Sequence, residues 1–199
     1  LDEIDKISGR TDKIGGDGIA AYRLHEGLLQ SEIESQMLVL RKATSNPTVH
    51  RFMPRMSRFQ RLQTRYASKQ YSRHLKQNSR QPDSAYWSLN NSPYPIADQI
   101  NAFNADIVHI HWVGDNYLPI QQFSKINAPI IWTLHDMWAF TGGCHYSGDC
   151  QAYQTGCGNC PQLTNPLPDD ISQQVIQQKI QAWSDTPMTI VCPSQWLAE

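Results

Sequence analysis

The chain has 199 residues, of which 40% are hydrophobic and 18% are charged, and its formal net charge at pH 7 is −1. This length allows one ordinary domain with a buried core. No apolar run approaches the roughly 20 residues that a membrane-spanning helix needs, and no charged-then-apolar leader opens the sequence. We therefore expect a soluble, cytoplasmic protein.

A glycine-rich turn precedes the first predicted helix. Gly15 and Gly16 come just before Asp17, and apolar residues at helical spacing follow, which predicts a helix over about 17–31. The apolar run over 37–40 then predicts a short buried strand. Backbone N–H groups at the start of such a helix suit a diphosphate. The same pattern is also ordinary turn chemistry, and Asp17 would cap the helix but repel an anion.

The next segment is strongly basic. No acidic residue occurs between Glu34 and Asp83, a stretch that holds most of the 17 Lys and Arg residues. Basic residues recur every three or four positions beside apolar ones over 53–80, which predicts one long helix with a cationic stripe. Residues 51–80 could contact an anionic membrane, or the apolar edge of the helix could pack on the sheet while the cations are solvated. Nucleic-acid binding is the least favoured interpretation, because no recognised nucleic-acid fold surrounds the helix.

Helices and strands alternate in the second half of the chain. After a polar loop over 81–94, the patterns predict a helix at 96–103, a strand at 106–112, a helix at 117–125, a strand at 129–134, a helix at 171–183 and a strand at 188–192. The strands are near-continuous apolar runs. This arrangement predicts an α/β fold with a parallel sheet that is covered by helices on both faces.

Polar residues follow the predicted strands. Ligands of open parallel sheets bind beyond the carboxyl ends of the strands, where this sequence places His111–Trp112, His135–Asp136 and Ser194. The His135–Asp136 pair could position or polarise a sugar hydroxyl or a phosphate. Alternatively, it caps a turn and its histidine is a satisfied, half-buried polar residue.

Residues 142–163 form a loop rich in glycine and cysteine. Ordering each residue costs roughly 1–2 kcal/mol of backbone entropy, which so few aliphatic side chains do not offset. The spacing C-x5-C-x6-C-x2-C places Cys144, Cys150, Cys157 and Cys160 as ligands of a structural zinc ion. Two disulfides and unliganded thiols are the alternatives. Cys192, alone in an apolar strand, reads as a small buried hydrophobe.

Taken together, these motifs resemble a known family. Four segments are similar to the N-terminal half of bacterial family-four glycosyltransferases of the colanic-acid and capsular-polysaccharide type. They are GGDGIAAYRLHEGL, ADIVHIHWVGD, APIIWTLHDMWAFTGGCHYSGDCQAYQTGCGNCPQL and VCPSQWLAE. The resemblance covers 15–45 and 96–199. It implies that 1–199 is an incomplete, acceptor-side Rossmann-like domain of a GT-B fold, with 142–163 as a Cys-rich insertion. The C-terminal donor domain of that fold is absent from this sequence.

The resemblance also implies an activity and roles for individual residues. The reaction would move a sugar from a nucleotide-sugar donor to a glycan or polyprenyl-linked acceptor, with retention of configuration and without a catalytic metal. Gly15 and Gly16 would lie beside the donor diphosphate, and His135 near the transferred sugar, oriented by Asp136. Trp112 and Gly114 line the acceptor side by position. Such an enzyme is expected at the inner face of the membrane.

Two departures from the family pattern bear on these expectations. Residues 1–13 contain no apolar run, so the strand that normally leads into the glycine turn is predicted to be missing. The sequence also ends before the paired glutamates that hold the donor in this family, so the fragment alone is expected to be inactive. A non-catalytic, zinc-stabilised interaction module is the alternative function.

Overall fold

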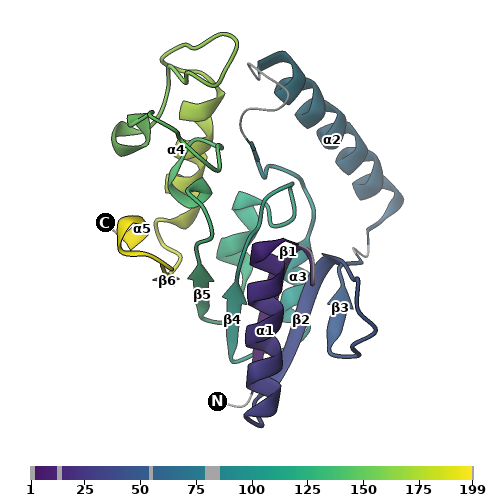
Figure 1. Ribbon diagram of the computed structural model, residues 1–199. Helices are drawn as coiled ribbons and strands as arrows, with labels where there is room; N and C mark the ends of the chain where they lie inside the picture. Colours follow the sequence, from purple (N-terminus) through teal and green to yellow (C-terminus); the bar gives the residue numbers. More distant parts are fainter. Residues whose placement is uncertain (1–2, 13–14, 54–55, 79–85, 199) are drawn as a thin grey trace.

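The computed structural model describes residues 3–12, 15–53, 56–78 and 86–198. These residues form a six-stranded sheet in the order β3-β2-β1-β4-β5-β6, and all neighbouring strands are parallel (Figure 1). The strands are β1 (Glu3–Thr11), β2 (Glu34–Arg41), β3 (Val49–Arg51), β4 (Ile107–Ile110), β5 (Ile130–Thr133) and β6 (Met188–Val191). This order is compatible with a Rossmann-like fold.

The helices connect the strands largely as the sequence predicts. They are α1 (Gly16–Gln30), α2 (Arg58–Asn78), α3 (Ile96–Asn101), α4 (Ile171–Trp183) and α5 (Gln195–Ala198), with 3-10 helices η1 (Ile120–Lys125), η2 (Trp138–Phe140) and η3 (Ala152–Thr155). The helix expected over 117–125 is thus a shorter 3-10 helix. The basic helix begins at Arg58, directly after Ser57, whose backbone carbonyl accepts the N–H of Arg61 at 3.0 Å.

The first strand corrects a prediction from the sequence. No strand is expected before the glycine turn, yet β1 occupies the middle of the sheet, where Ile4 pairs with Ser35 of β2 and with Ile107 of β4. Strand formation depends on the neighbouring strands as much as on the composition of the strand itself, and β1 has neighbours on both sides. The prediction that the leading strand is missing is therefore wrong, and the glycine turn follows a central strand.

Alternate residues of β2 face opposite sides of the sheet. Met37 and Val39 belong to one buried cluster with Ala21 and Tyr22 of α1, whereas Leu38 belongs to the larger cluster that includes residues of α3, η1 and α4. A period of two residues is the signature of a strand. The prediction of a parallel α/β sheet with helices on both faces is therefore confirmed.

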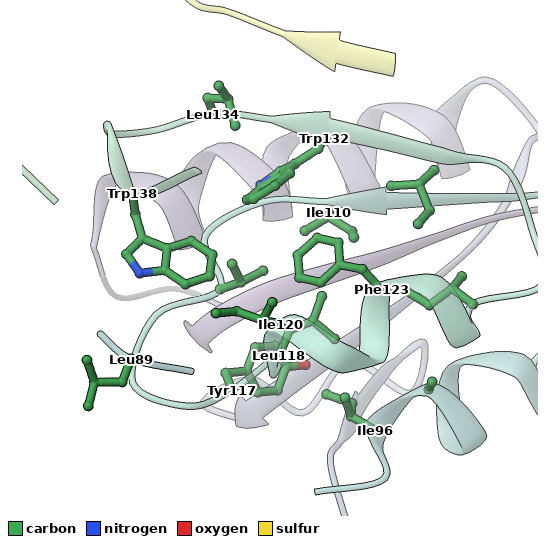
Figure 2. Close-up of a cluster of buried hydrophobic side chains, with 14 of the residues drawn as sticks. Leu89, Ile96, Ile110, Tyr117, Leu118, Ile120, Phe123, Trp132, Leu134 and Trp138 are labelled. Atoms are coloured by element: carbon green, nitrogen blue, oxygen red, sulfur yellow. The ribbon is translucent and has the colours of Figure 1, made fainter. Parts of the chain in front are cut away.

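Aromatic side chains fill the larger cluster. Phe123 of η1, Trp132 of β5 and Trp138 of η2 are buried there (Figure 2). The ring centroid of Trp132 lies 5.0 Å from that of Phe123 and 5.4 Å from that of Trp183 on α4. Each such pair contributes about 0.5–1.5 kcal/mol beyond the surface that it buries. This packing fixes β5, and with it the start of the segment that carries His135.

Helix α2 stands away from the sheet (Figure 1). Phe59, Leu62 and Tyr66 have 68%, 65% and 66% of their surface exposed, although their spacing places them on one side of the helix. Basic residues exposed on the same helix are Arg58, Arg61, Arg65, Lys69 and Arg73. The interpretation in which the apolar edge of this helix packs on the sheet is therefore wrong. Within the described ranges, no helix combines the length and the hydropathy needed to cross a membrane.

Candidate functional site

Three loops lie at the carboxyl edge of the sheet, where the strand order reverses between β1 and β4. Open parallel sheets bind ligands at such a reversal. The glycine turn that begins α1 follows β1, His111–Trp112 follows β4, and His135–Asp136 follows β5. The fold therefore brings residues from distant parts of the sequence to one edge.

Gly15 precedes α1 with φ 88° and ψ 155°, a conformation that glycine adopts without strain. Its carbonyl accepts the N–H of Ile19 at 3.1 Å. A Cβ atom at Gly15 would lie 2.7 Å from Oδ1 of Asp17, whereas Gly16 has open space around it. The first N–H groups of a helix have no partner within the helix, and together with the helix dipole they suit an anionic group.

His135 is half-buried near the start of α1. Its Nε2 lies 3.0 Å from Nδ1 of the buried His111, so one ring donates a hydrogen bond to the other. Burial lowers the pKa of His135, and the carboxylates of Asp17 and Asp136 oppose this shift without cancelling it. His135 is therefore neutral at pH 7.

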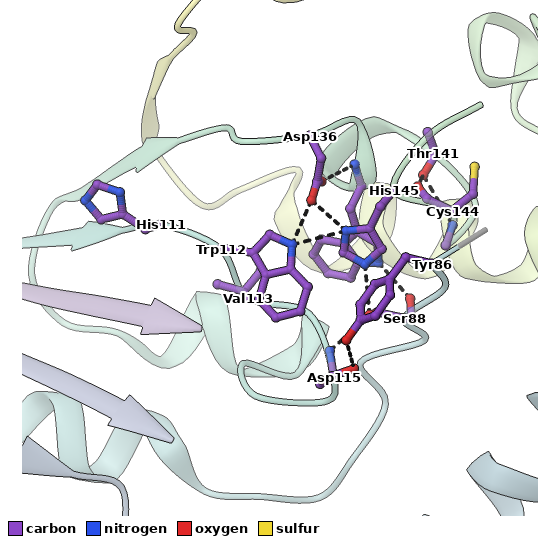
Figure 3. A network of polar contacts seen from close by, with 12 residues as sticks. Tyr86, Ser88, His111, Trp112, Val113, Asp115, Asp136, Thr141, Cys144 and His145 are labelled. Carbon is purple, nitrogen blue, oxygen red and sulfur yellow. Dashed lines mark hydrogen bonds and ion pairs between the residues drawn. The ribbon is translucent and has the colours of Figure 1, made fainter. Parts of the chain in front are cut away.

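Asp136 points into a polar network (Figure 3). Its Oδ2 accepts a hydrogen bond from Nε1 of Trp112 at 2.7 Å and lies 2.6 Å from Nδ1 of His145. The family resemblance implies that Asp136 orients His135. In the structure, His135 shares a hydrogen bond with His111, so His111 orients His135 and Asp136 holds the Trp112 and His145 rings.

The network continues from His145 to the segment before α3. Nε2 of His145 lies 2.9 Å from Oγ of Ser88, which accepts the N–H of Asp115 at 3.0 Å. The hydroxyl of Tyr86 donates to the same Asp115 (Figure 3). The contacts thus run from Ser88 to His145 to Asp136, as they do from serine to histidine to aspartate in a nucleophilic triad. Ser88 is fully buried, however, so its hydroxyl is out of reach of a substrate and the three residues join segments instead.

Trp112 and Gly114 line the same small cavity as His135 and Asp136. The Trp112 ring is half-buried, and its centroid lies 5.3 Å from that of His145. A Cβ atom at Gly114 would lie only 2.3 Å from Cζ2 of Trp112, so a larger residue would displace the indole. The structure thus gathers these predicted residues at one place, with the glycine turn approaching His135 from α1.

Sequence reasoning did not identify Tyr86, Ser88 and His145 as members of this site. Tyr86 and Ser88 come from a polar stretch that carries no motif. His145 directly follows Cys144, the first cysteine of the loop, and belongs to no motif of its own. The one signal in the sequence is that His145 follows Asp136 by nine residues in one glycine-rich loop, which allows an imidazole to return to a carboxylate.

The Cys-rich loop over 142–163 is tied to the start of α4. Asp170 caps this helix through Oδ1, which accepts the N–H of Ser172 at 2.9 Å, while its Oδ2 accepts the N–H of Cys160 at 2.8 Å. Oγ of Ser172 accepts the N–H of Gly158 at 2.9 Å. Burial alone would raise the pKa of Asp170, but hydrogen bonds from Ser172 and the backbone outweigh it and lower the pKa. Hydrogen bonds to the side chains of Asp170 and Ser172 therefore hold much of this loop.

Four cysteines border one cavity in this loop. We call them the thiol cluster: Cys144, Cys150, Cys157 and Cys160. All five cysteines are free thiols. Burial raises the pKa of Cys144 to about 11 and that of Cys160 to about 12. In the part of the chain that the structure describes, no three His, Cys, Asp or Glu side chains stand in the arrangement of a metal site. The zinc assignment stays a prediction.

Comparison with known proteins finds a partial similarity. No family model matches the sequence. The chain is similar to the Escherichia coli K12 protein named "Putative colanic acid biosynthesis glycosyl transferase WcaC", with 30% identity over 104 residues. The match covers 47% of this chain and spans 25% of the length of that relative. The chain is thus similar to about a quarter of the length of that relative.

Proposed function

We propose that this chain is the acceptor-side, N-terminal part of a retaining GT-B glycosyltransferase that uses a nucleotide-sugar donor. One observation carries the proposal: the glycine turn of α1 follows β1 and His135 follows β5, so both lie at the carboxyl edge of a sheet whose strand order reverses between β1 and β4. This edge is the ligand-binding position of such sheets. The partial similarity to a colanic acid biosynthesis glycosyl transferase supports the same conclusion.

Each part of the site would have a distinct task in sugar transfer. The N–H groups that begin α1, with Gly15 and Gly16, stabilise the diphosphate as it leaves. Neutral His135 hydrogen-bonds a hydroxyl of the transferred sugar. Trp112 offers an indole face on the acceptor side, where an aromatic ring can pack on a sugar or polyprenyl-linked substrate. The contribution of the protein is placement and charge stabilisation of the reacting groups.

A direct assay tests this function. The whole protein that contains this chain should release a nucleoside diphosphate from one member of a panel of nucleotide-sugars when a glycan or polyprenyl-phosphate acceptor is present. NMR of the new linkage should show the anomeric configuration of the donor. An inverted product would contradict the retaining mechanism. The absence of donor-dependent product with every acceptor would instead favour the interaction-module interpretation.

The exposed helix α2 supports a peripheral position on an anionic membrane, as a second part of the proposal. Its apolar residues, Phe59, Leu62 and Tyr66, are exposed beside a row of exposed cations. Each basic residue near an anionic surface contributes about 1 kcal/mol, and exposed aromatic residues insert at the lipid interface. We propose that α2 holds the protein at the cytoplasmic face, where a lipid-linked acceptor would be presented.

Vesicle binding tests the role of α2. Reversing two charges with Arg61→Glu and Arg65→Glu should weaken binding to phosphatidylglycerol-containing vesicles by at least about tenfold, because two attractive charges become repulsive. Sedimentation with vesicles at fixed ionic strength measures the change. The matched control is Lys125→Glu, which reverses an exposed charge on η1 and should bind normally. Equal binding to neutral vesicles, or equally tight binding to random duplex DNA, would contradict this role.

A further inference from the structure

The thiol cluster has a backbone arranged around its cavity. Cys144 forms an isolated antiparallel bridge with Trp87, which fixes one side. On the other side, Cys157 and Cys160 flank a tight turn in which Cys157, Gly158 and Asn159 all have positive φ. Left-handed backbone costs roughly 1–2 kcal/mol for a non-glycine residue. Two such residues in one turn need stabilisation from the groups around them.

Hydrogen bonds supply part of that stabilisation. The N–H of Gly142 donates to Sγ of Cys157 at 3.1 Å, and the turn is held by Asp170 and Ser172 through the N–H groups of Cys160 and Gly158. A sulfur that accepts a backbone N–H is a better acceptor as a thiolate, since hydrogen bonds to charged acceptors are roughly twice as strong. This contact favours the thiolate form of Cys157 but does not outweigh burial, which raises the pKa of that thiol.

A buried amine lies next to the cluster. Lys179 of α4 is 1% exposed, and its Nζ donates to the carbonyl oxygens of Trp138 and Thr141. Nζ also lies 3.6 Å from the centroid of the Trp138 ring. Burial lowers the pKa of Lys179, and the electrostatic effects of Cys144, Asp136 and Cys157 oppose this shift. A buried ammonium is costly unless negative charge lies near it, and two carbonyls and a ring supply only partial charges.

From these contacts we infer that the thiol cluster binds one structural zinc ion, with Lys179 beside it as a counter-charge. Each thiol releases its proton to solvent on binding, so four thiolates and Zn²⁺ form a centre of net charge −2. The ammonium of Lys179 offsets part of that charge. Among the described residues these side chains do not stand in a metal-site arrangement, so zinc binding would require the Sγ atoms to turn toward a common centre by rotation about Cα–Cβ.

The ion would have a structural task. Four protein ligands leave no open position for substrate or water, so the centre takes no part in the chemistry. The ion would hold this loop in a single conformation. Because His145 lies in the loop directly after Cys144, the ion would also hold in place the imidazole that contacts Asp136. This inference concerns the loop alone and does not depend on the proposed sugar transfer.

Metal analysis of the whole protein, purified under reducing conditions, tests the inference. Cys150→Ser should lose close to one zinc per chain relative to wild type, while Cys192→Ser, the matched control at the end of β6, should keep it. In the cobalt-substituted protein, the absorption of a tetrahedral cobalt–thiolate centre should appear and be absent from Cys150→Ser. Zinc below about half an equivalent, iron in its place, or equal metal in the two variants would overturn the inference.

Two further measurements keep the test decisive if Cys150→Ser does not fold. In folded wild-type protein, a thiol-modifying reagent should release zinc in step with labelling of the thiol cluster, as read by a chelating dye and peptide mapping. Labelling of the cluster without release would overturn the inference. Lys179→Met should lower zinc affinity by about 10- to 100-fold, the usual effect of losing an outer partner of a metal site. Unchanged affinity would remove Lys179 from the centre.

Discussion

His135→Ala should lower kcat/KM for sugar transfer by about 100-fold in the whole protein, which corresponds to about 2.7 kcal/mol of lost transition-state stabilisation. His135 is neutral and half-buried, and it lies near the start of α1. Its ring can therefore hydrogen-bond a sugar hydroxyl in a partly desolvated site, where such a bond is strong. Initial rates at varied donor concentration give the value, and the loss should appear mainly in kcat.

Two variants separate this role from a general effect on the fold. His50→Ala removes a half-buried histidine that hydrogen-bonds Gln36, away from the carboxyl edge of the sheet, and should leave the rate unchanged. His135→Gln should recover part of the activity, because an amide can still donate a hydrogen bond. A His135→Ala protein that turns over at the wild-type rate would remove this ring from the mechanism.

Asp136→Ala should destabilise the folded protein by about 3 kcal/mol, since it removes the carboxylate that the half-buried Trp112 indole and the buried His145 ring share. The side chains of His145 and Asp136 are 2% and 9% exposed, so water replaces the lost hydrogen bonds poorly. At roughly 2–4 °C per kcal/mol for a chain of this size, the Tm should fall by about 6–12 °C. Differential scanning calorimetry measures the shift.

Asp149→Ala is the matched control for this prediction. Asp149 is an exposed carboxylate in the same loop, and its removal should change the Tm little. Asp136→Asn should lie between the two, because the amide keeps the shape of the side chain and one acceptor oxygen. Equal Tm values for Asp136→Ala and Asp149→Ala would show that the network in Figure 3 contributes little to stability.

Periodicity in the sequence predicted much of the fold. Helix α4 matches its predicted span, and β4, β5 and β6 lie within the predicted strands, because continuous apolar runs between helical patterns have few alternatives. The segment of β1 lacked such a run, and it forms a strand because β2 and β4 offer hydrogen-bonding partners on both sides. The composition of the β1 segment alone carries no information about these neighbouring strands.

The sequence by itself determined which residues follow β4 and β5, and so placed His135 at the carboxyl edge of the sheet. The glycine turn reaches the same edge through β1, which only the tertiary structure revealed. Only the tertiary structure decided how the side chains at this edge pair. His111 rather than Asp136 bonds His135, and Asp136 reaches back to Trp112 and His145, because a loop returns chain segments to one another at distances that no sequence period encodes. The tertiary structure also leaves the apolar side of α2 exposed. The length of a helix and the spacing of its apolar residues do not specify what lies beside it.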